Sequence, residues 1–293
     1  MSFYAQEVRS QPALWRHFAE QVERTRTQLP RPGQRLAVAG CGTSYYVAGA
    51  YAALREGAGA GESDAFAASQ APRGRRYDAA LALSRSGTTS EVLRWLRAQP
   101  SGVERLAIVG TPETPIAAAA GNPLLLDAAD EQSIVQTRFA TSTLALLRAG
   151  LGDDVQALAD QADGVLAAAH PFDAGRFDHF VFIGEGFGAW LAQEAALKMR
   201  ETTGAWTEAY PAPEYRHGPV SAASDRTLVW ALGRVGDDVL EHASTAGATV
   251  QDTGLDPMVE LVRVHLQAEA EAERRGRDID VPPYLSRSVV LSH

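Results

Sequence analysis

One pattern recurs in both halves of this 293-residue chain: a short apolar run ends in glycines and leads into a helical stretch. The first copy spans residues 35–56 and the second spans residues 179–201. The matching glycines are Gly40 and Gly42 in the first copy and Gly184 and Gly186 in the second. A second pair of runs, Ala80–Leu83 and Val229–Leu232, repeats the arrangement, and Leu106–Gly110 has a weaker counterpart at Ala248–Gln251. Such internal similarity indicates a duplicated supersecondary unit.

The repeated runs predict the fold class. Apolar runs of four to six residues without alternation favour parallel strands buried on both faces, joined by helices in βαβ units. We therefore predict an α/β fold with two parallel sheets, divided near residue 152 into domains 1–152 and 153–293. The second half is expected to open with a helix over 153–169, ended by Pro171. A closing helix over 256–275 would stop at Gly276, and residues 281–293 would be extended.

Composition excludes several classes of protein. Hydrophobic residues make up 45% and charged residues 22%, which suits a globular core. A net charge of −9 argues against a general nucleic-acid binder, and Cys41, the only cysteine, excludes disulfides within the chain and multi-cysteine metal sites. Arg138 and Arg148 bracket the longest apolar run, which is too short for a membrane helix, and the N-terminus lacks an apolar signal core. We expect a cytoplasmic protein that acts on a small molecule, without nucleic-acid or membrane partners.

Small hydroxyl residues gather after two predicted strands of the first half. Ligands of parallel sheets bind at the carboxyl ends of the strands, where helix N-termini attract anions. A phosphate site is therefore predicted from Gly42, Thr43, Ser44, Ser84, Arg85, Ser86, Thr88 and Thr89. The corresponding loop of the second half carries Asp237 and Asp238, which would repel a phosphate, so only the first half is expected to bind one.

Three motifs together resemble the sugar isomerase (SIS) family: Gly40-Cys-Gly-Thr-Ser44, Ser84-Arg-Ser-Gly-Thr-Thr-Ser-Glu91 and Glu214-Tyr-Arg-His-Gly-Pro219. Their order is similar to that in the isomerase half of glucosamine-6-phosphate synthase and in glutaminase-free SIS-type amino-sugar-phosphate deaminases, over about residues 36–291. The resemblance implies two tandem SIS subdomains with flavodoxin-like sheets. It also implies a homodimer around the active sites and sugar-phosphate substrates, with no metal and no organic cofactor.

The resemblance also implies catalytic roles. Residues 196–201 are similar to the family segment whose final glutamate, here Glu201, carries a proton between C1 and C2 of the sugar. Lys198, the only lysine among 27 basic residues, shares a helix face with Glu201. It is either an amine used in the chemistry or a plain i,i+4 partner of Glu194. His217 matches the family's ring-opening histidine, which those dimers donate across the subunit interface.

Two further stretches bear on the sugar. Residues 131–138 resemble the segment that faces the sugar in the deaminase-like branch, so Glu131, Ser133 and Gln136 are predicted sugar contacts. The alternative is a helix start that Ser133 caps. Where the family tail normally carries a lysine, this chain has Arg287, which can hold a sugar oxygen or a phosphate but forms no imine at neutral pH.

The leading hypothesis is an enzyme that converts glucosamine 6-phosphate to fructose 6-phosphate and ammonia. One alternative is a deglycase that splits a fructosamine phosphate into a sugar phosphate and an amino acid. Another is an isomerase that consumes free ammonia to form glucosamine 6-phosphate, since no counterpart of the synthase's glutaminase domain is present. The fourth hypothesis is a non-catalytic sensor of sugar phosphates.

Overall fold

Two parallel β-sheets form the framework of the protein, as the computed structural model shows for residues 1–72, 74–168 and 173–291. The strands of the first sheet are β1 (Leu36–Gly40), β2 (Ser63–Ala67), β3 (Ala79–Ser84), β4 (Glu104–Val109) and β5 (Leu124–Leu125). Those of the second sheet are β6 (His179–Gly184), β7 (Trp206–Pro211), β8 (Thr227–Leu232) and β9 (Thr249–Gln251).

Strand order confirms the predicted fold class. The first sheet runs β2-β1-β3-β4-β5, which is the flavodoxin-like order, and the second runs β7-β6-β8-β9, which repeats its first four places. All the paired strands are parallel. The predicted runs that start both halves form the central strands β1 and β6, and the second pair of runs forms β3 and β8 beside them.

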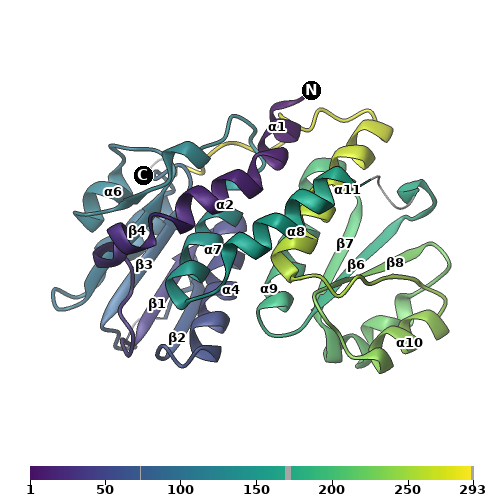
Figure 1. Ribbon diagram of the computed structural model, residues 1–293, viewed down its shortest axis with the longest axis horizontal. Helices are drawn as coiled ribbons and strands as arrows, with labels where there is room; N and C mark the ends of the chain where they lie inside the picture. Colours follow the sequence, from purple (N-terminus) through teal and green to yellow (C-terminus); the bar gives the residue numbers. More distant parts are fainter. Residues whose placement is uncertain (73, 169–172, 292–293) are drawn as a thin grey trace.

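The helices enclose both sheets. In the first half they are α1 (Phe3–Arg9), α2 (Gln11–Ala19), α3 (Val22–Thr25), α4 (Thr43–Gly57), α5 (Ser90–Arg97), α6 (Pro115–Ala120) and α7 (Arg138–Leu151). In the second half they are α8 (Val155–Ala167), α9 (Phe187–Thr203), α10 (Asp237–Thr245) and α11 (Pro257–Arg274). Figure 1 shows the two sheets in separate lobes, with α2, α4, α7, α8, α9 and α11 between them.

Side-chain alternation along the strands assigns each helix to a face of its sheet. In β6, Phe180 and Phe182 belong to the large core shared with α9 and α11, whereas Val181 and Ile183 belong to a second cluster with α10. The first sheet has the same division, because Val92 of α5 packs on its outer face. Successive side chains of a strand point to opposite faces, so each half has an inner and an outer core. The large inner core contains residues of both halves.

Matched glycines explain why the two halves begin alike. Gly42 and Gly186, which precede α4 and α9, have φ/ψ of 54°/−128° and 54°/−125°. Residues with a side chain rarely adopt this backbone conformation. A Cβ on Gly40 or Gly184 would lie 2.5 or 2.4 Å from the backbone of the following helix. Both strand-to-helix turns therefore require glycine at two positions.

The predicted ends of the second half agree with the structure within two residues. Asp154 caps α8 by accepting the Ala157 N–H at 3.0 Å, and Gly276 follows α11 with a φ of +64°. Pro171 lies outside the described residues, and no helix or strand occurs in 281–291. The division near residue 152 stays a prediction.

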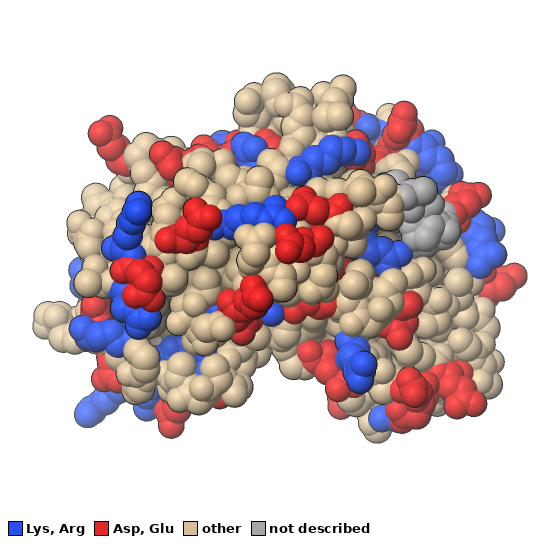
Figure 2. All heavy atoms as spheres, viewed as in Figure 1, with Lys and Arg blue, Asp and Glu red and all other residues tan. Residues whose placement is uncertain are grey.

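The surface carries charges of both signs, and Figure 2 shows acidic and basic side chains interspersed on the face in view. Within the described residues, no helix is both long enough and apolar enough to cross a membrane.

Candidate active site

The first predicted phosphate loop joins β1 to α4. The sharp turn at Gly42 begins α4 at Thr43, and both Thr43 and Ser44 are buried. A helix of this length directs unpaired N–H groups and a partial positive charge at its N-terminus, which suits an anion. The turn therefore places two hydroxyl residues at the start of a helix, as the sequence predicts.

The second loop joins β3 to α5 and is held by its own side chains. Ser84 Oγ accepts the Gly87 N–H at 3.1 Å, and Ser86 Oγ accepts the Thr88 N–H at 3.3 Å. Thr89 precedes α5 and makes no capping hydrogen bond through its side chain. Because β1 and β3 are neighbours, the two loops lie at one edge of the sheet. All eight predicted phosphate-binding residues belong to these two loops.

Arg85 is the exception among them, because its guanidinium turns inward. The residue is 2% exposed, and its Nη1 donates to the Ser133 carbonyl at 3.0 Å and to Glu131 Oε2 at 3.3 Å. Its Nη2 donates to the Arg287 carbonyl at 3.2 Å, while its Nε is buried without a partner. Arg85 thus joins the phosphate loop to segment 131–137 and to the C-terminal tail, and keeps one free donor.

The structure of segment 131–137 agrees only in part with the sequence analysis, which offered either three sugar contacts or a helix start capped by Ser133. The helix begins at Arg138 with Thr137 as its N-cap residue, and Glu131, not Ser133, holds this end: Glu131 Oε1 accepts the N–H groups of Thr137 at 2.5 Å and of Phe139 at 3.4 Å. The alternative of a Ser133 cap is therefore wrong. The Glu131 carboxylate is fully buried and engaged with Thr137 and Arg85. By contrast, Ser133 Oγ and Gln136 Oε1 are buried atoms without hydrogen-bond partners. Of the three predicted sugar contacts, these two have capacity for a ligand.

Arg287 anchors the C-terminal tail to residues 130 and 131. Its Nη2 lies 2.5 Å from Asp130 Oδ1, and its Nη1 donates to the Glu131 carbonyl. The tail then crosses the second phosphate loop, where Ser288 Oγ accepts from Thr88 Oγ1 at 2.9 Å. The Arg287 guanidinium is thus bound to the protein itself, and the backbone of the tail lies against the site.

Lys198 and Glu201 meet on α9 as their three-residue spacing predicts. Lys198 Nζ lies 2.5 Å from Glu201 Oε2 and 3.6 Å from Glu194 Oε1, and Lys198 is only 1% exposed. Close packing sets this helix against α4, because a Cβ on Gly49 would lie 2.1 Å from the Trp190 ring. The predicted acid–base residues of the second half are therefore on α9, the helix that contacts α4 of the first half.

The three ionisable groups of this cluster, Glu194, Lys198 and Glu201, differ in how their surroundings affect them. Burial raises the pKa of the Glu194 carboxyl to about 8, with the Lys198 cation opposing the rise and the Glu201 carboxylate adding to it; Thr43 also opposes it. For Lys198, burial favours the neutral amine, but Glu194 and Glu201 outweigh it and the pKa is raised. At neutral pH Glu194 is therefore mostly protonated, and the Lys198 ammonium ion is paired with Glu201.

His217 is not brought to this cluster within one chain. It is exposed and follows the short 3-10 turn Ala212–Arg216. That turn packs on the outer face of the second sheet through Ala212 and Tyr215, whereas α9 covers the inner face. No hydrogen bond or ion pair of the described residues joins the His217 ring to Lys198 or Glu201.

Sequence reasoning missed three contributors to the site. It treated Glu194 only as a partner of Lys198, although the i,i+4 spacing placed both on one face. Asp130, which holds Arg287, and Ser288, which contacts Thr88, had no signal in the sequence. Their partners are more than 150 positions away in the chain, so only the tertiary structure reveals them.

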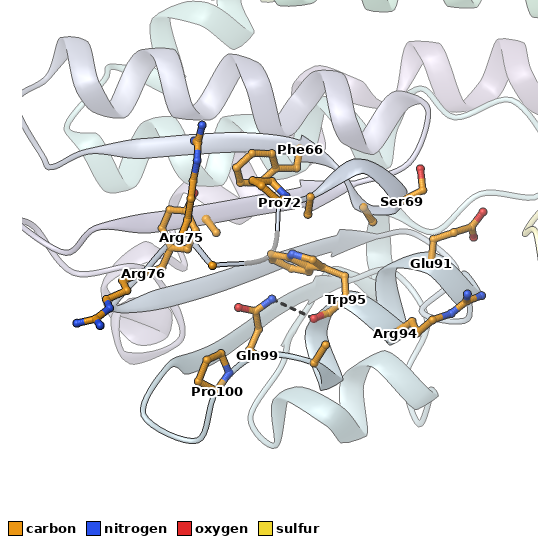
Figure 3. Close-up of a pocket in the computed structure, with 16 residues that line it drawn as sticks. Phe66, Ser69, Pro72, Arg75, Arg76, Glu91, Arg94, Trp95, Gln99 and Pro100 are labelled. Atoms are coloured by element: carbon orange, nitrogen blue, oxygen red, sulfur yellow. Dashed lines mark hydrogen bonds between the residues drawn. The ribbon is translucent and has the colours of Figure 1, made fainter.

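A groove of about 830 Å³ lies elsewhere on the first half, between the segment after β2 and α5. Figure 3 shows Trp95 near Phe66 and Gln99, with Arg75 and Arg76 at one end of the groove and Glu91 and Arg94 at the other. None of the predicted site residues is among its described lining residues. The groove is therefore separate from the candidate site.

Comparison with known proteins places this geometry in context. No protein-family model matches the chain. A glutamine–fructose-6-phosphate aminotransferase of Halobacterium salinarum is 28% identical over 313 aligned positions, which cover 87% of this chain and 52% of that protein. The one from Methanothermobacter thermautotrophicus is 26% identical, with 99% and 57% covered. The chain thus spans about half the length of these curated relatives.

Solved structures share the fold over nearly the whole chain. Glucosamine-6-phosphate deaminase from Thermotoga maritima has a TM-score of 0.87 at 24% identity, covering 99% of this chain and all of that one. Tagatose-6-phosphate ketose/aldose isomerase from Escherichia coli has a TM-score of 0.79 at 15% identity, with 97% of each chain covered. These similarities in sequence and fold agree with the resemblance drawn from the motifs.

Proposed function

We propose that the chain is a phosphosugar isomerase of the sugar isomerase (SIS) family and that it deaminates an amino-sugar phosphate. The substrate that best fits is glucosamine 6-phosphate, and the products are fructose 6-phosphate and ammonia. One observation carries the proposal: the ion pair of buried Lys198 with partly buried Glu201 lies on α9, which packs against α4, the helix whose start carries the hydroxyl residues Thr43 and Ser44.

The two halves would perform different tasks. The hydroxyls of Ser44, Ser84, Ser86 and Thr89 and the N-terminus of α4 would bind the phosphate without a lysine. Glu201 would remove the proton from C2 of the open-chain sugar and return it to C1. The C2 amine then becomes an imine, and addition of water to that imine releases ammonia and leaves the C2 ketone. Lys198 would hold Glu201 in place as a carboxylate.

Ring opening needs a further acid or base, and we propose that a second copy of the chain supplies it. His217 is exposed and follows a turn that packs on the outer face of the second sheet, whereas the Lys198–Glu201 pair of the same chain lies on α9, which covers the inner face. Histidine is the side chain that most often performs general acid–base catalysis. The proposal therefore includes a homodimer in which each copy donates His217 to the other.

The test is ammonia release from glucosamine 6-phosphate by the purified protein. We expect release by the wild type and a loss of at least 100-fold in Glu201→Gln, since general acid–base groups contribute about 10²–10⁴-fold. Glu273→Gln, an exposed glutamate on α11, is the matched control and should behave as the wild type. Absence of ammonia release, with cleavage of a fructosamine phosphate instead, would replace the deaminase by a deglycase. Sugar-phosphate binding without turnover of either substrate would indicate a sensor.

A further inference from the structure

A buried carboxylate of the N-terminal helix reaches the segment that carries the predicted sugar contacts. Glu7 of α1 is only 2% exposed, and its Oε1 accepts the backbone N–H groups of Gln132 at 2.6 Å and Ser133 at 3.3 Å. Its Oε2 is buried without a partner. Burying a carboxylate is costly unless it is paired or hydrogen-bonded, and here the bonds come from one short loop.

Helix α1 is itself fixed to the base of the C-terminal tail. The Asp280 carboxylate accepts the N–H groups of Phe3 and Tyr4 at 2.9 and 2.8 Å. The Asp280 carbonyl accepts the N–H of Ile134 at 3.1 Å. Figure 1 shows α1 beside the yellow segment that leads to the tail. Three consecutive amides, from Gln132 to Ile134, are therefore held by groups from the two ends of the chain.

Segment 131–137 needs such external support. It contains no helix or strand, so its backbone amides depend on side-chain acceptors and on carbonyl groups of other segments. Its Ser133 hydroxyl and Gln136 carbonyl oxygen are buried without partners. The orientation of both side chains follows from the backbone that Glu7 holds. A carboxylate acceptor strengthens such hydrogen bonds about twofold over a neutral one.

We propose that Glu7 is a positioning residue for sugar binding, holding segment 131–137 so that Ser133 and Gln136 face the substrate. This inference rests on the proposed function, because it assumes that the segment contacts the sugar.

The charge on Glu7 makes the inference testable by pH. Burial and the Glu131 carboxylate raise the pKa of Glu7 to about 7, while the amides of Gln132 and Ser133 and the Arg138 cation oppose the rise. The hydrogen bonds from Gln132 and Ser133 to Glu7 should therefore be strongest above pH 7, where Glu7 is ionised, and weaker below pH 7. A residue that only supports the fold would show no such dependence in substrate binding.

The experiment compares Glu7→Gln with the wild type from pH 6 to pH 8.5, with KM for glucosamine 6-phosphate as the readout. Glutamine keeps the size and one acceptor oxygen but cannot ionise. The substrate phosphate titrates near pH 6 in both proteins, so the ratio of their KM values cancels its contribution. We expect Glu7→Gln to raise KM about fivefold at pH 8 and to match the wild type at pH 6, because charge-assisted hydrogen bonds are the stronger ones. The kcat should stay within twofold.

Glu269→Gln is the matched control. Glu269 pairs with Arg9 at 2.9 Å and so joins α1 to α11 without contact to segment 131–137. It should leave KM and its pH dependence unchanged. A KM ratio that is the same at every pH, or a Glu7→Gln protein that equals the wild type throughout, would overturn the proposal.

Amide hydrogen exchange gives a readout independent of turnover. Glu7→Leu should speed exchange at Gln132 and Ser133 by at least tenfold, while Glu7→Gln should have a smaller effect. If Glu7→Leu does not fold, Glu7→Gln at pH 8 carries the same test. Unchanged exchange at both amides refutes the positioning role. A wild type that neither turns over nor binds glucosamine 6-phosphate, yet shows the expected exchange, instead refutes the proposed function and removes the sugar-binding part of this inference.

Discussion

Lys198 should act as a fixed ammonium ion and not as an amine nucleophile. Its Nζ lies 2.5 Å from Glu201 Oε2, inside the protein, and the two neighbouring carboxyl groups raise its pKa above the ordinary value of 10.5. With its pKa raised in this way, Lys198 is an ammonium ion at neutral pH. An imine between Lys198 and a sugar carbonyl would need the neutral amine.

Substitution by a neutral residue should therefore cost stability as well as activity. Removing one partner of a buried ion pair destabilises a protein by about 3–5 kcal/mol. Lys198→Met belongs at the lower end, about 3 kcal/mol, because the Glu201 side chain is 20% exposed and Glu194 is mostly protonated at pH 7. At about 2 °C per kcal/mol for a chain of this size, the melting temperature should fall by about 6 °C.

Lys198→Arg is the informative companion because it keeps the charge but forms no imine. We expect it to retain measurable ammonia release, whereas Lys198→Met should lose it. Urea unfolding measures the stabilities, and borohydride reduction in the presence of glucosamine 6-phosphate followed by mass spectrometry detects an imine. A reduced adduct on Lys198, or a Lys198→Met protein within 1 kcal/mol of the wild type, would refute the reasoning.

Two further predictions concern the turn and the cluster. Gly42→Ala should destabilise the protein by about 1–3 kcal/mol, because a residue with a Cβ is strained at a φ of 54° and a ψ of −128°. Urea unfolding measures the loss. The control is Gly57→Ala at the end of the same helix, where a Cβ would meet open space. The raised pKa of Glu194 means that the native state binds its proton more tightly than the unfolded state. Stability should therefore fall as pH rises from about 4.5 to about 8, and Glu194→Gln should remove this slope in urea titrations at several pH values; an unchanged slope contradicts the assignment.

The sequence predicted the inner strands of both sheets and missed the edge strands β2 and β7. Strands β1, β3, β6 and β8 lie within their sheets and consist of continuous apolar runs, which is the pattern that parallel strands require. Strands β2 (Ser63–Ala67) and β7 (Trp206–Pro211) are edge strands, contain acidic residues and are only partly buried. They carry no apolar run, so no sequence signal marked them.

The features of the candidate site that lie within short segments were predictable, whereas contacts between distant segments were not. The glycine turns, the hydroxyl loops and the Lys198–Glu201 spacing are encoded in short segments and were predictable. The engagement of Glu131 with Arg85 and of Arg287 with Asp130 depends on segments 46 and 157 positions apart. The residue type alone does not show whether a polar side chain binds a ligand or another group of the protein. For Glu131 and Arg287, only the fold shows that the side chain is bonded within the protein.

Duplication and divergence together explain how one site arises from two similar halves. Both halves present a helix N-terminus after a glycine turn of nearly identical φ and ψ, so both inherited an anion-binding geometry. In the second half, Asp237 and Asp238 occupy the first turn of α10, where they interact favourably with the helix dipole and repel a phosphate. The second half is therefore not expected to bind a phosphate at this helix. Its helix α9 carries Lys198 and Glu201 instead, and α9 packs against α4, whose N-terminus belongs to the predicted phosphate site, so the proposed proton-transfer residues lie on a helix in contact with that site's helix.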